Sequence, residues 1–268
     1  MTERIELPNG AVILETRDGV AWVRLARPEH ANTMNLELSK DLHEAALRCG
    51  DDASVRAVVL TGEGRFFCAG GDARYLGGQG DSLPRAVREA TTYLHAAISR
   101  FARMDPPVIA AVNGPAAGGG VCLVAMSDLA LSARSAHYSI AFPQLGFSID
   151  CGGTFFLPRV MGARRAFEFV LTGQRLSADE AAAAGLVTRV VDDAQLLSEA
   201  SALAAKLAAG ATRAFGGIKR LLRASSAENL EAHLENESRT LAEIVKTHDA
   251  REGLAAFAEK RAARFEGR

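Results

Sequence analysis

Two glycine-rich stretches are the part of the sequence best suited to chemistry. Residues 64–76 read GRFFCAGGDARYL and residues 113–128 read NGPAAGGGVCLVAMSD, and each follows an apolar run typical of a buried strand. In a strand–glycine turn–helix unit the first helical N–H groups lack backbone partners, and glycine lets another group approach them closely. Two such turns can direct one N–H each at the same oxygen, as in an oxyanion hole. The alternative is a pair of packing turns without a ligand, and neither stretch has the GxGxxG or GK[ST] pattern of a nucleotide site.

Asp150 is the second chemical candidate. It lies within LGFSIDCGGTFFLPRVMG, residues 145–162, which is otherwise apolar. A carboxylate in such surroundings needs a partner or a function, and an apolar pocket makes a carboxylate more basic and excludes water. A general base is one interpretation, and an N-cap for the helix that follows is the other. Cys151 has no evident base beside it and is interpreted as a small core residue.

Composition limits the remaining classes. The chain has 268 residues, 48% hydrophobic and 24% charged, with a net charge of −1, so there is no basic field for nucleic acid. The most basic stretch, residues 259–268, is equally well interpreted as a solvated helix end. The four cysteines have neither CxxC nor zinc-site spacing, so no metal is expected. Without an apolar leader or a membrane-length apolar run, we expect a reduced, cytoplasmic protein with no membrane partner.

The elements that position these residues alternate. Residues 11–25 read as two strands around the turn pair Asp18-Gly19, a helix is expected over 36–50, and 137–142 is a strand candidate. Strands alternate with helices to about residue 160, which favours an α/β core with parallel pairing. The later chain is alanine-rich and helical, with a capping box predicted at Ser177 and Glu180.

Five blocks of the sequence resemble those of the crotonase (enoyl-CoA hydratase/isomerase) superfamily, in the same order along the chain. They are FCAGGD, AAVNGPAAGGG, RPEHANTMN, LTGQRLSADEAAAAGLVTRVV and REGLAAFAEKR. The resemblance implies an α/β fold built as a spiral of ββα units over residues 1–200, followed by a C-terminal helical trimerisation region over 201–268. It also implies an acyl-CoA thioester substrate, a homotrimer or dimer of trimers, and no separate cofactor, since coenzyme A is part of the substrate.

The resemblance also assigns roles to individual positions. The oxyanion donors fall on the N–H groups of Gly71 and Gly119. The resemblance also implies positions that contact coenzyme A or the acyl group. They are Glu29, His30, Ala31, Thr33, Ala69, Asp72, Leu76, Phe142, Phe257 and Lys260. Phe257 and Lys260 would reach coenzyme A from a neighbouring subunit.

Departures from the family pattern indicate which reaction to expect. The two glutamates with which hydratases of this family activate water are replaced by Cys122 and Phe142, and neither can orient water and move protons in their place. Asp150 falls on the general base of some family isomerases. The surrounding stretch resembles the 2-(1,2-epoxy-1,2-dihydrophenyl)acetyl-CoA isomerase subgroup, except at Ile149, where that subgroup has proline. We therefore expect an isomerase that shifts a double bond by proton transfer through Asp150.

His95 keeps other chemistries open. A single histidine on a helix is usually structural, but this position matches a catalytic histidine of the family's 4-chlorobenzoyl-CoA dehalogenases, in which Asp150 would be the nucleophile. Those enzymes have tryptophan where this chain has Phe142. The alternatives are a hydratase with atypical groups, a dehalogenase or thioesterase that uses Asp150 and His95, and a degenerate protein that only binds CoA esters.

Overall fold

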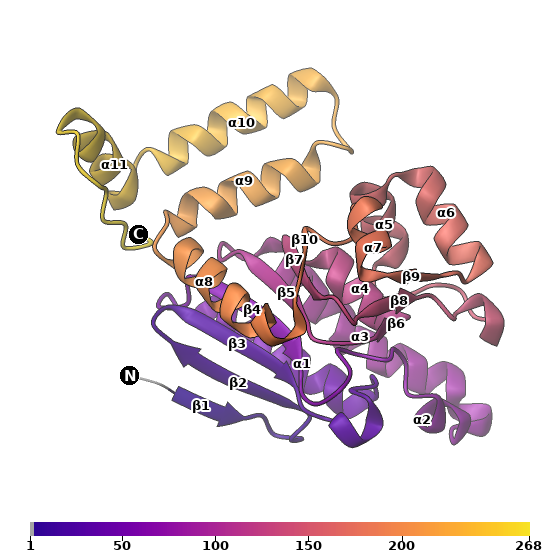
Figure 1. Cartoon of the computed structure of the whole chain (residues 1–268). Coiled ribbons are helices and arrows are strands. Elements are labelled where there is room, and N and C mark those ends of the chain that lie inside the picture. The colour runs from indigo at the N-terminus through magenta and orange to yellow at the C-terminus, as the bar shows by residue number, and fades with distance from the viewer. Residues whose placement is uncertain (1–2) are drawn as a thin grey trace.

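A seven-stranded mixed sheet forms the centre of the computed structural model, which describes residues 3–268 (Figure 1). Its strand order is β1–β2–β3–β4–β5–β7–β10; β1, β2 and β3 pair antiparallel, and all later pairings are parallel. The predicted turn joins β2 to β3, with positive φ at Asp18 and Gly19. The strands are β1 (Glu3–Glu6), β2 (Val12–Arg17), β3 (Val20–Leu25), β4 (Ala57–Gly62), β5 (Val108–Val112), β7 (Leu129–Ala133) and β10 (Arg189–Val191).

A second, three-stranded sheet of short strands lies next to the glycine turns. It consists of β6 (Ala116–Ala117), β8 (His137–Ser139) and β9 (Arg175–Ser177), with β6 and β8 parallel and β8 and β9 antiparallel. The two sheets, linked by helices along one winding chain, confirm the predicted α/β spiral.

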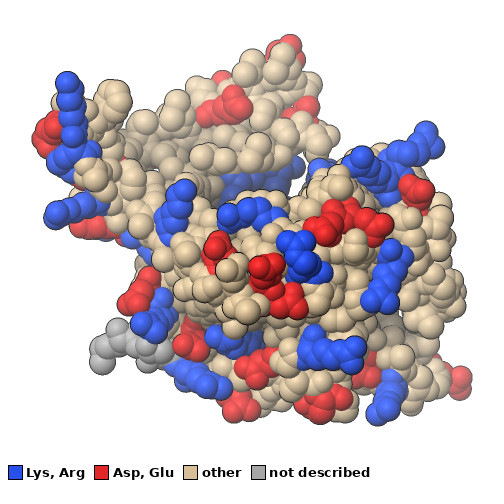
Figure 2. Space-filling view, in the orientation of Figure 1, with Lys and Arg blue, Asp and Glu red and all other residues tan. Residues whose placement is uncertain are grey.

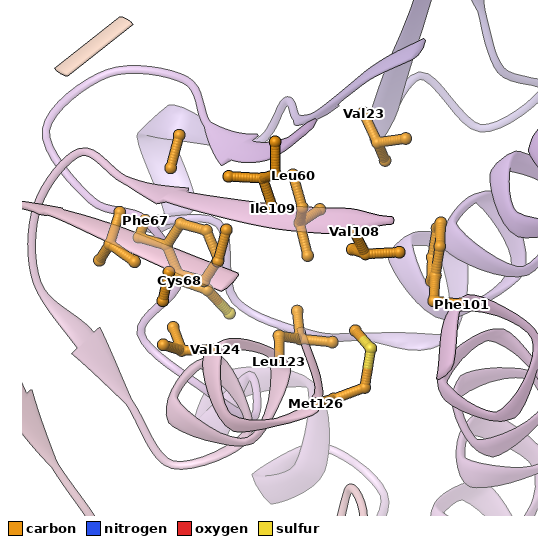
Figure 3. Packing of buried hydrophobic residues seen from close by; sticks show 14 of the residues in the cluster. Val23, Leu60, Phe67, Cys68, Phe101, Val108, Ile109, Leu123, Val124 and Met126 are labelled. Atoms are coloured by element: carbon orange, nitrogen blue, oxygen red, sulfur yellow. The ribbon is translucent and has the colours of Figure 1, made fainter. Parts of the chain in front are cut away.

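Helices cover the main sheet because their apolar faces need burial. The helix α8 packs on β3, β4, β5 and β7, while α1 packs on α3. Phe101 of α3 and Leu123 and Met126 of α4 lie against Val108 and Ile109 of β5 (Figure 3). The helices are α1 (Leu36–Asp51), α2 (Ala73–Gly77), α3 (Leu83–Arg103), α4 (Gly119–Met126), α5 (Gly153–Met161), α6 (Ala163–Thr172), α7 (Ala178–Ala183), α8 (Leu196–Ala208), α9 (Thr212–Ala224), α10 (Leu230–Ile244) and α11 (His248–Ala258).

The last three helices, α9 to α11, form an arm that extends from the body (Figure 1). Among its described residues α10 has none that is buried, and its leucines stay exposed, Leu230 by 66% and Leu241 by 64%. The predicted domain boundary at residue 200 falls inside α8, so the arm itself begins later, at α9. A trimerisation role for the C-terminal region stays a prediction.

A buried ion cluster ties α9 to the body. Lys219 Nζ lies 2.6 Å from Asp128 Oδ2, and Arg223 Nη2 lies 2.9 Å from Asp128 Oδ1. The same carboxylate accepts a hydrogen bond from the N–H of Val108, at the start of β5. Burial lowers the pKa of the Lys219 ammonium, and the charge of Asp128 opposes that shift. Asp128 therefore supplies the counter-charge for a buried cation whose other hydrogen bond goes to the neutral carbonyl of Pro106.

Asp128→Asn is expected to lower the free energy of unfolding by about 3 kcal/mol, because it breaks a buried ion pair and leaves Lys219 unpaired. Urea unfolding followed by circular dichroism measures this loss. The control is Asp179→Asn, which breaks an exposed pair with Arg134 and should cost less than about 1 kcal/mol. Equal losses in the two variants would contradict the importance of the buried cluster.

Surface charge is mixed, and the described part of the chain contains no helix suited to span a membrane. Figure 2 shows both signs of charge interspersed over the visible face, in keeping with a net charge of −1. Within residues 3–268 no helix is both long enough and apolar enough to cross a bilayer.

Candidate active site

The two glycine turns lie side by side. Cys68 and Ala116 form an isolated parallel bridge, and the N–H of Ala117 donates to the carbonyl of Cys68 over 2.9 Å. Gly70 has a φ of +90°, and a Cβ added there would lie 2.8 Å from the Ala117 carbonyl oxygen. Gly118, with a φ of +49°, faces Gly70 from the other turn. Glycine is needed at both positions because the two backbones are in contact.

Two backbone N–H groups beside this contact are available to a ligand. Gly119 is the first residue of α4, and Gly71 lies between two backbone hydrogen bonds that join the turn to Met34. Among the hydrogen bonds of residues 3–268, none uses the N–H of Gly71 or of Gly119 as donor. Free donors on adjoining turns are what an oxyanion hole requires, so the geometry is compatible with the role predicted for both residues.

Asp150 and His95 form a direct pair. His95 Nε2, on α3, lies 2.6 Å from Asp150 Oδ1, in the loop before α5. The N-cap of α5 is Gly152, with no side-chain cap hydrogen bond, so the helix-cap interpretation of Asp150 is wrong. The expectation of a buried carboxylate is also wrong for the single chain: the Asp150 side chain is 34% exposed, because a cavity opens beside it.

Two buried thiols contact Asp150 on the side that faces the protein interior. Cys122 Sγ lies 3.4 Å from the carbonyl oxygen of Asp150, and Cys151 Sγ lies 3.8 Å from its Oδ2. Burial raises the pKa of both thiols well above the usual value, so they are neutral and Cys151 is no nucleophile near pH 7. Cys151 Sγ is also 3.0 Å from where a Cβ on Gly119 would lie. Cys151 therefore connects the carboxylate to the second glycine turn.

The positions of the hydratase glutamates carry no acid. Cys122 is fully buried in α4, and the Phe142 ring lies 3.6 Å from where a Cβ on Gly118 would be. The apolar ring of Phe142 thus packs beside the second glycine turn, at a position predicted to contact the acyl group.

A cavity of about 700 Å³ opens at the Asp150–His95 pair. Its walls come from one face of α3, the loop and first turn of α5, and the C-terminal half of α9. Asp150 is the only acidic residue among the described residues that line it. The lining residues are His95, Ile98, Ser99, Ala102, Arg103, Ile149, Asp150, Gly152, Thr154, Phe155, Phe156, Arg220, Arg223 and Ala224.

Several residues predicted to contact coenzyme A lie close together beside the first glycine turn, and none of them lines the cavity. The N–H of Ala69 donates to the carbonyl of Ala31, and Thr33 Oγ1 donates to Asp72 Oδ2. Glu29 and His30 are neighbours on the exposed short helix Pro28–His30, with 3.7 Å between His30 Nε2 and Glu29 Oε1. The structure thus brings this part of the predicted set together.

Asp72 fixes the shape of that region. Its Oδ1 caps α2, and its Oδ2 accepts hydrogen bonds from Arg27. Burial opposes ionisation, but the hydrogen bonds from Tyr75 N–H, Arg27 and Thr33 hold the pKa of Asp72 below its usual value. Leu76 lies one turn further along α2, 3.6 Å from where a Cβ on Gly71 would be.

Phe257 and Lys260 are not brought to this site. Phe257 is 86% exposed on α11, at the opposite end of the molecule from α2 (Figure 1). Lys260 follows that helix directly. A contact of these two residues with coenzyme A would require another copy of the chain, as the sequence-based expectation has it.

Sequence reasoning missed most of the cavity wall. Ile98, Ala102 and Arg103 follow His95 by three, seven and eight residues, which is the spacing of one helix face. This spacing predicts that the three residues lie on the same helix face as His95. Arg220 and Arg223 carried no such signal, because only the fold brings α9 beside α3.

Comparison with known proteins shows which family the chain resembles over nearly its whole length. The profile of the enoyl-CoA hydratase/isomerase family matches residues 15–268. The chain is 37% identical over 259 residues to the 1,2-epoxyphenylacetyl-CoA isomerase of Escherichia coli, covering 96% of this chain and 98% of that protein. It is 38% identical to a 4-chlorobenzoyl coenzyme A dehalogenase of Arthrobacter, covering 93% and 91%. A crystal structure of an enoyl-CoA hydratase from Polaromonas superposes with a TM-score of 0.90 at 32% identity, covering 96% and 100%.

Proposed function

Because the chain belongs to the enoyl-CoA hydratase/isomerase family of acyl-CoA enzymes, we propose that it is an acyl-CoA isomerase that shifts a double bond through Asp150. The proposal rests on which acid–base groups the site contains and which it lacks. Asp150 is the one acidic residue among the described residues of the cavity, whereas Cys122 and Phe142 occupy the positions where a hydratase needs glutamates. One carboxylate suffices to move a proton, while the addition of water needs more.

The proposed reaction uses these groups as follows. The thioester oxygen of a 3-enoyl-CoA accepts hydrogen bonds from the N–H groups of Gly71 and Gly119. Asp150 removes a proton from C2, and the electron pair moves into a dienolate whose negative charge lies on that oxygen. The protonated carboxyl then returns the proton to C4, and the double bond ends between C2 and C3. His95 holds the carboxylate in position through its 2.6 Å contact.

We propose the remaining features of the enzyme on the same basis. The segment from Glu29 to Thr33 and the turn from Ala69 to Leu76 bind coenzyme A, and Phe142 contacts the acyl group. The exposed arm assembles copies into a homotrimer or dimer of trimers, in which Phe257 and Lys260 approach a neighbour's coenzyme A. The enzyme works in the cytoplasm without a cofactor or metal.

Incubation with a 3-enoyl-CoA and a 2-enoyl-CoA in deuterated water tests the activity. Double-bond migration with deuterium in the acyl chain and no mass gain of water is the expected result. Addition of water without migration would overturn the isomerase assignment.

The contact between His95 and Asp150 favours one second candidate, an aroyl-CoA dehalogenase. In that reaction Asp150 attacks the halogen-bearing ring carbon, halide leaves, and water activated by His95 hydrolyses the resulting aryl ester. The 38% identity to an Arthrobacter 4-chlorobenzoyl coenzyme A dehalogenase adds support. Halide release from 4-chlorobenzoyl-CoA would favour this candidate over the isomerase.

His95→Gln is expected to lower kcat for isomerisation by about tenfold with little change in KM. The variant removes one charge-assisted hydrogen bond to the base, worth about 1.5 kcal/mol, but leaves the base itself. Steady-state kinetics measure the effect, with Ser99→Ala on the same helix face as control. A loss as large as that in Asp150→Asn would show that His95 itself transfers the proton.

A further inference from the structure

We infer that the far end of the cavity binds a carboxylate, so that the preferred substrates are CoA thioesters whose acyl chain ends in an anionic group. This inference rests on the proposed function, since it names the substrate class of the same site. It starts from an asymmetry in the cavity wall. Asp150 and His95 lie at one end, and the other charged groups among the described lining residues are three arginines, Arg103, Arg220 and Arg223.

The distance between the two ends suits an extended chain. Arg103 comes eight residues after His95 on α3, so the helix rise separates them by about 12 Å along the axis. Ile98 and Ala102 lie on the α3 face between them, and Phe156 faces them from α5. Apart from the hydroxyls of Ser99 and Thr154 this middle section is apolar, and it takes the methylene groups of an extended chain.

The arginines differ in what they already bind. Arg220 lies against Asp105, and Arg223 against Asp128, so two of the three charges are compensated within the protein. Arg103 is exposed and makes no ion pair within residues 3–268. Its guanidinium is therefore free to donate hydrogen bonds to a substrate carboxylate. Arginine binds carboxylates through two parallel hydrogen bonds.

The surroundings of Arg103 add to its attraction for an anion. Arg220 and Arg223 are fixed to the body by aspartates that are not among the residues lining the cavity. A carboxylate at this end thus meets cations from α3 and α9, whereas a terminal methyl group forms no hydrogen bond with them.

Binding of two saturated thioesters of equal length tests the inference without chemistry. Calorimetry should show octanedioyl-CoA binding about tenfold tighter than octanoyl-CoA to the wild-type protein. Arg103→Gln should abolish this preference and leave octanoyl-CoA binding unchanged, while the control Arg100→Gln, on the same helix but outside the cavity wall, should retain it. Equal affinities in the wild type, or a preference that survives in Arg103→Gln, would overturn the inference.

Turnover separates this inference from the proposed function. With 3-octenedioyl-CoA and 3-octenoyl-CoA, the expected result is a kcat/KM about tenfold higher for the former, lost in Arg103→Gln. If both isomerise equally well, the substrate class is wrong and the isomerase stands. If neither isomerises while the binding preference persists, the isomerase is wrong and the anion-binding end stands.

Discussion

Asp150→Asn is expected to reduce kcat for double-bond migration by about 10³-fold or more, because an amide cannot accept the proton from C2. The variant keeps the size of the side chain and an oxygen that can face His95 Nε2, now 2.6 Å from Oδ1. CoA esters should still bind with near wild-type affinity, since none of the predicted coenzyme A contacts lines the cavity beside Asp150.

The measurement is turnover of a 3-enoyl-CoA together with deuterium exchange at C2. Exchange should fall in parallel with turnover, because both begin with the same proton transfer. Circular dichroism and thermal unfolding establish that the variant is folded. A folded Asp150→Asn enzyme with substantial activity would remove Asp150 from the mechanism and direct attention to His95.

Gly119→Ala is expected to lower kcat by about 10²-fold, the usual cost of losing one oxyanion donor. A Cβ at this position would lie 2.8 Å from Met34 Sδ and 3.0 Å from Cys151 Sγ. Either the first turn of α4 moves, which redirects the Gly119 N–H, or Cys151 moves, and Cys151 contacts the Asp150 carboxylate. Both responses disturb the chemical step more than the binding of coenzyme A.

Two other glycines provide the comparison for this variant. A Cβ on Gly50 would meet nothing within 4 Å, so Gly50→Ala should behave as wild type. A Cβ on Gly120 would lie 2.2 Å from the Cys68 carbonyl oxygen, so Gly120→Ala should damage the fold itself. Wild-type kcat in folded Gly119→Ala would contradict the assignment of its N–H to the oxyanion hole.

Local signals in the sequence predicted much of the fold. The Asp18-Gly19 turn and the Ser177–Glu180 capping box form as expected, because each depends only on residues within a few positions. The helix expected over 36–50 extends to Asp51. The strand expected over 137–142 is shorter, His137–Ser139, and Pro143 begins a short helix soon after it.

The site was predictable only in part, for a physical reason. Asp150, His95, Gly71 and Gly119 were predicted through the family resemblance, and the structure places Asp150 in direct contact with His95. The exposure of Asp150 was not foreseen, since it depends on a cavity whose walls come from α3, α5 and α9. Arg220 joins that wall from more than a hundred residues after α3, and no local pattern reports such a contact.

The burial of the four cysteines makes the native protein resistant to thiol reagents. All four are free and buried, and burial raises the pKa of Cys49 and Cys68 to about 12, so hardly any thiolate exists at neutral pH. Alkylation should therefore proceed only when the structure opens, so the alkylation rate measures how often that opening occurs. The alkylation rate of Cys49 on α1 reports opening of the region beside α3. The alkylation rates of Cys122 and Cys151 report opening of the segment around Asp150. A bound CoA ester that stabilises this segment would slow the second pair and leave Cys49 unchanged.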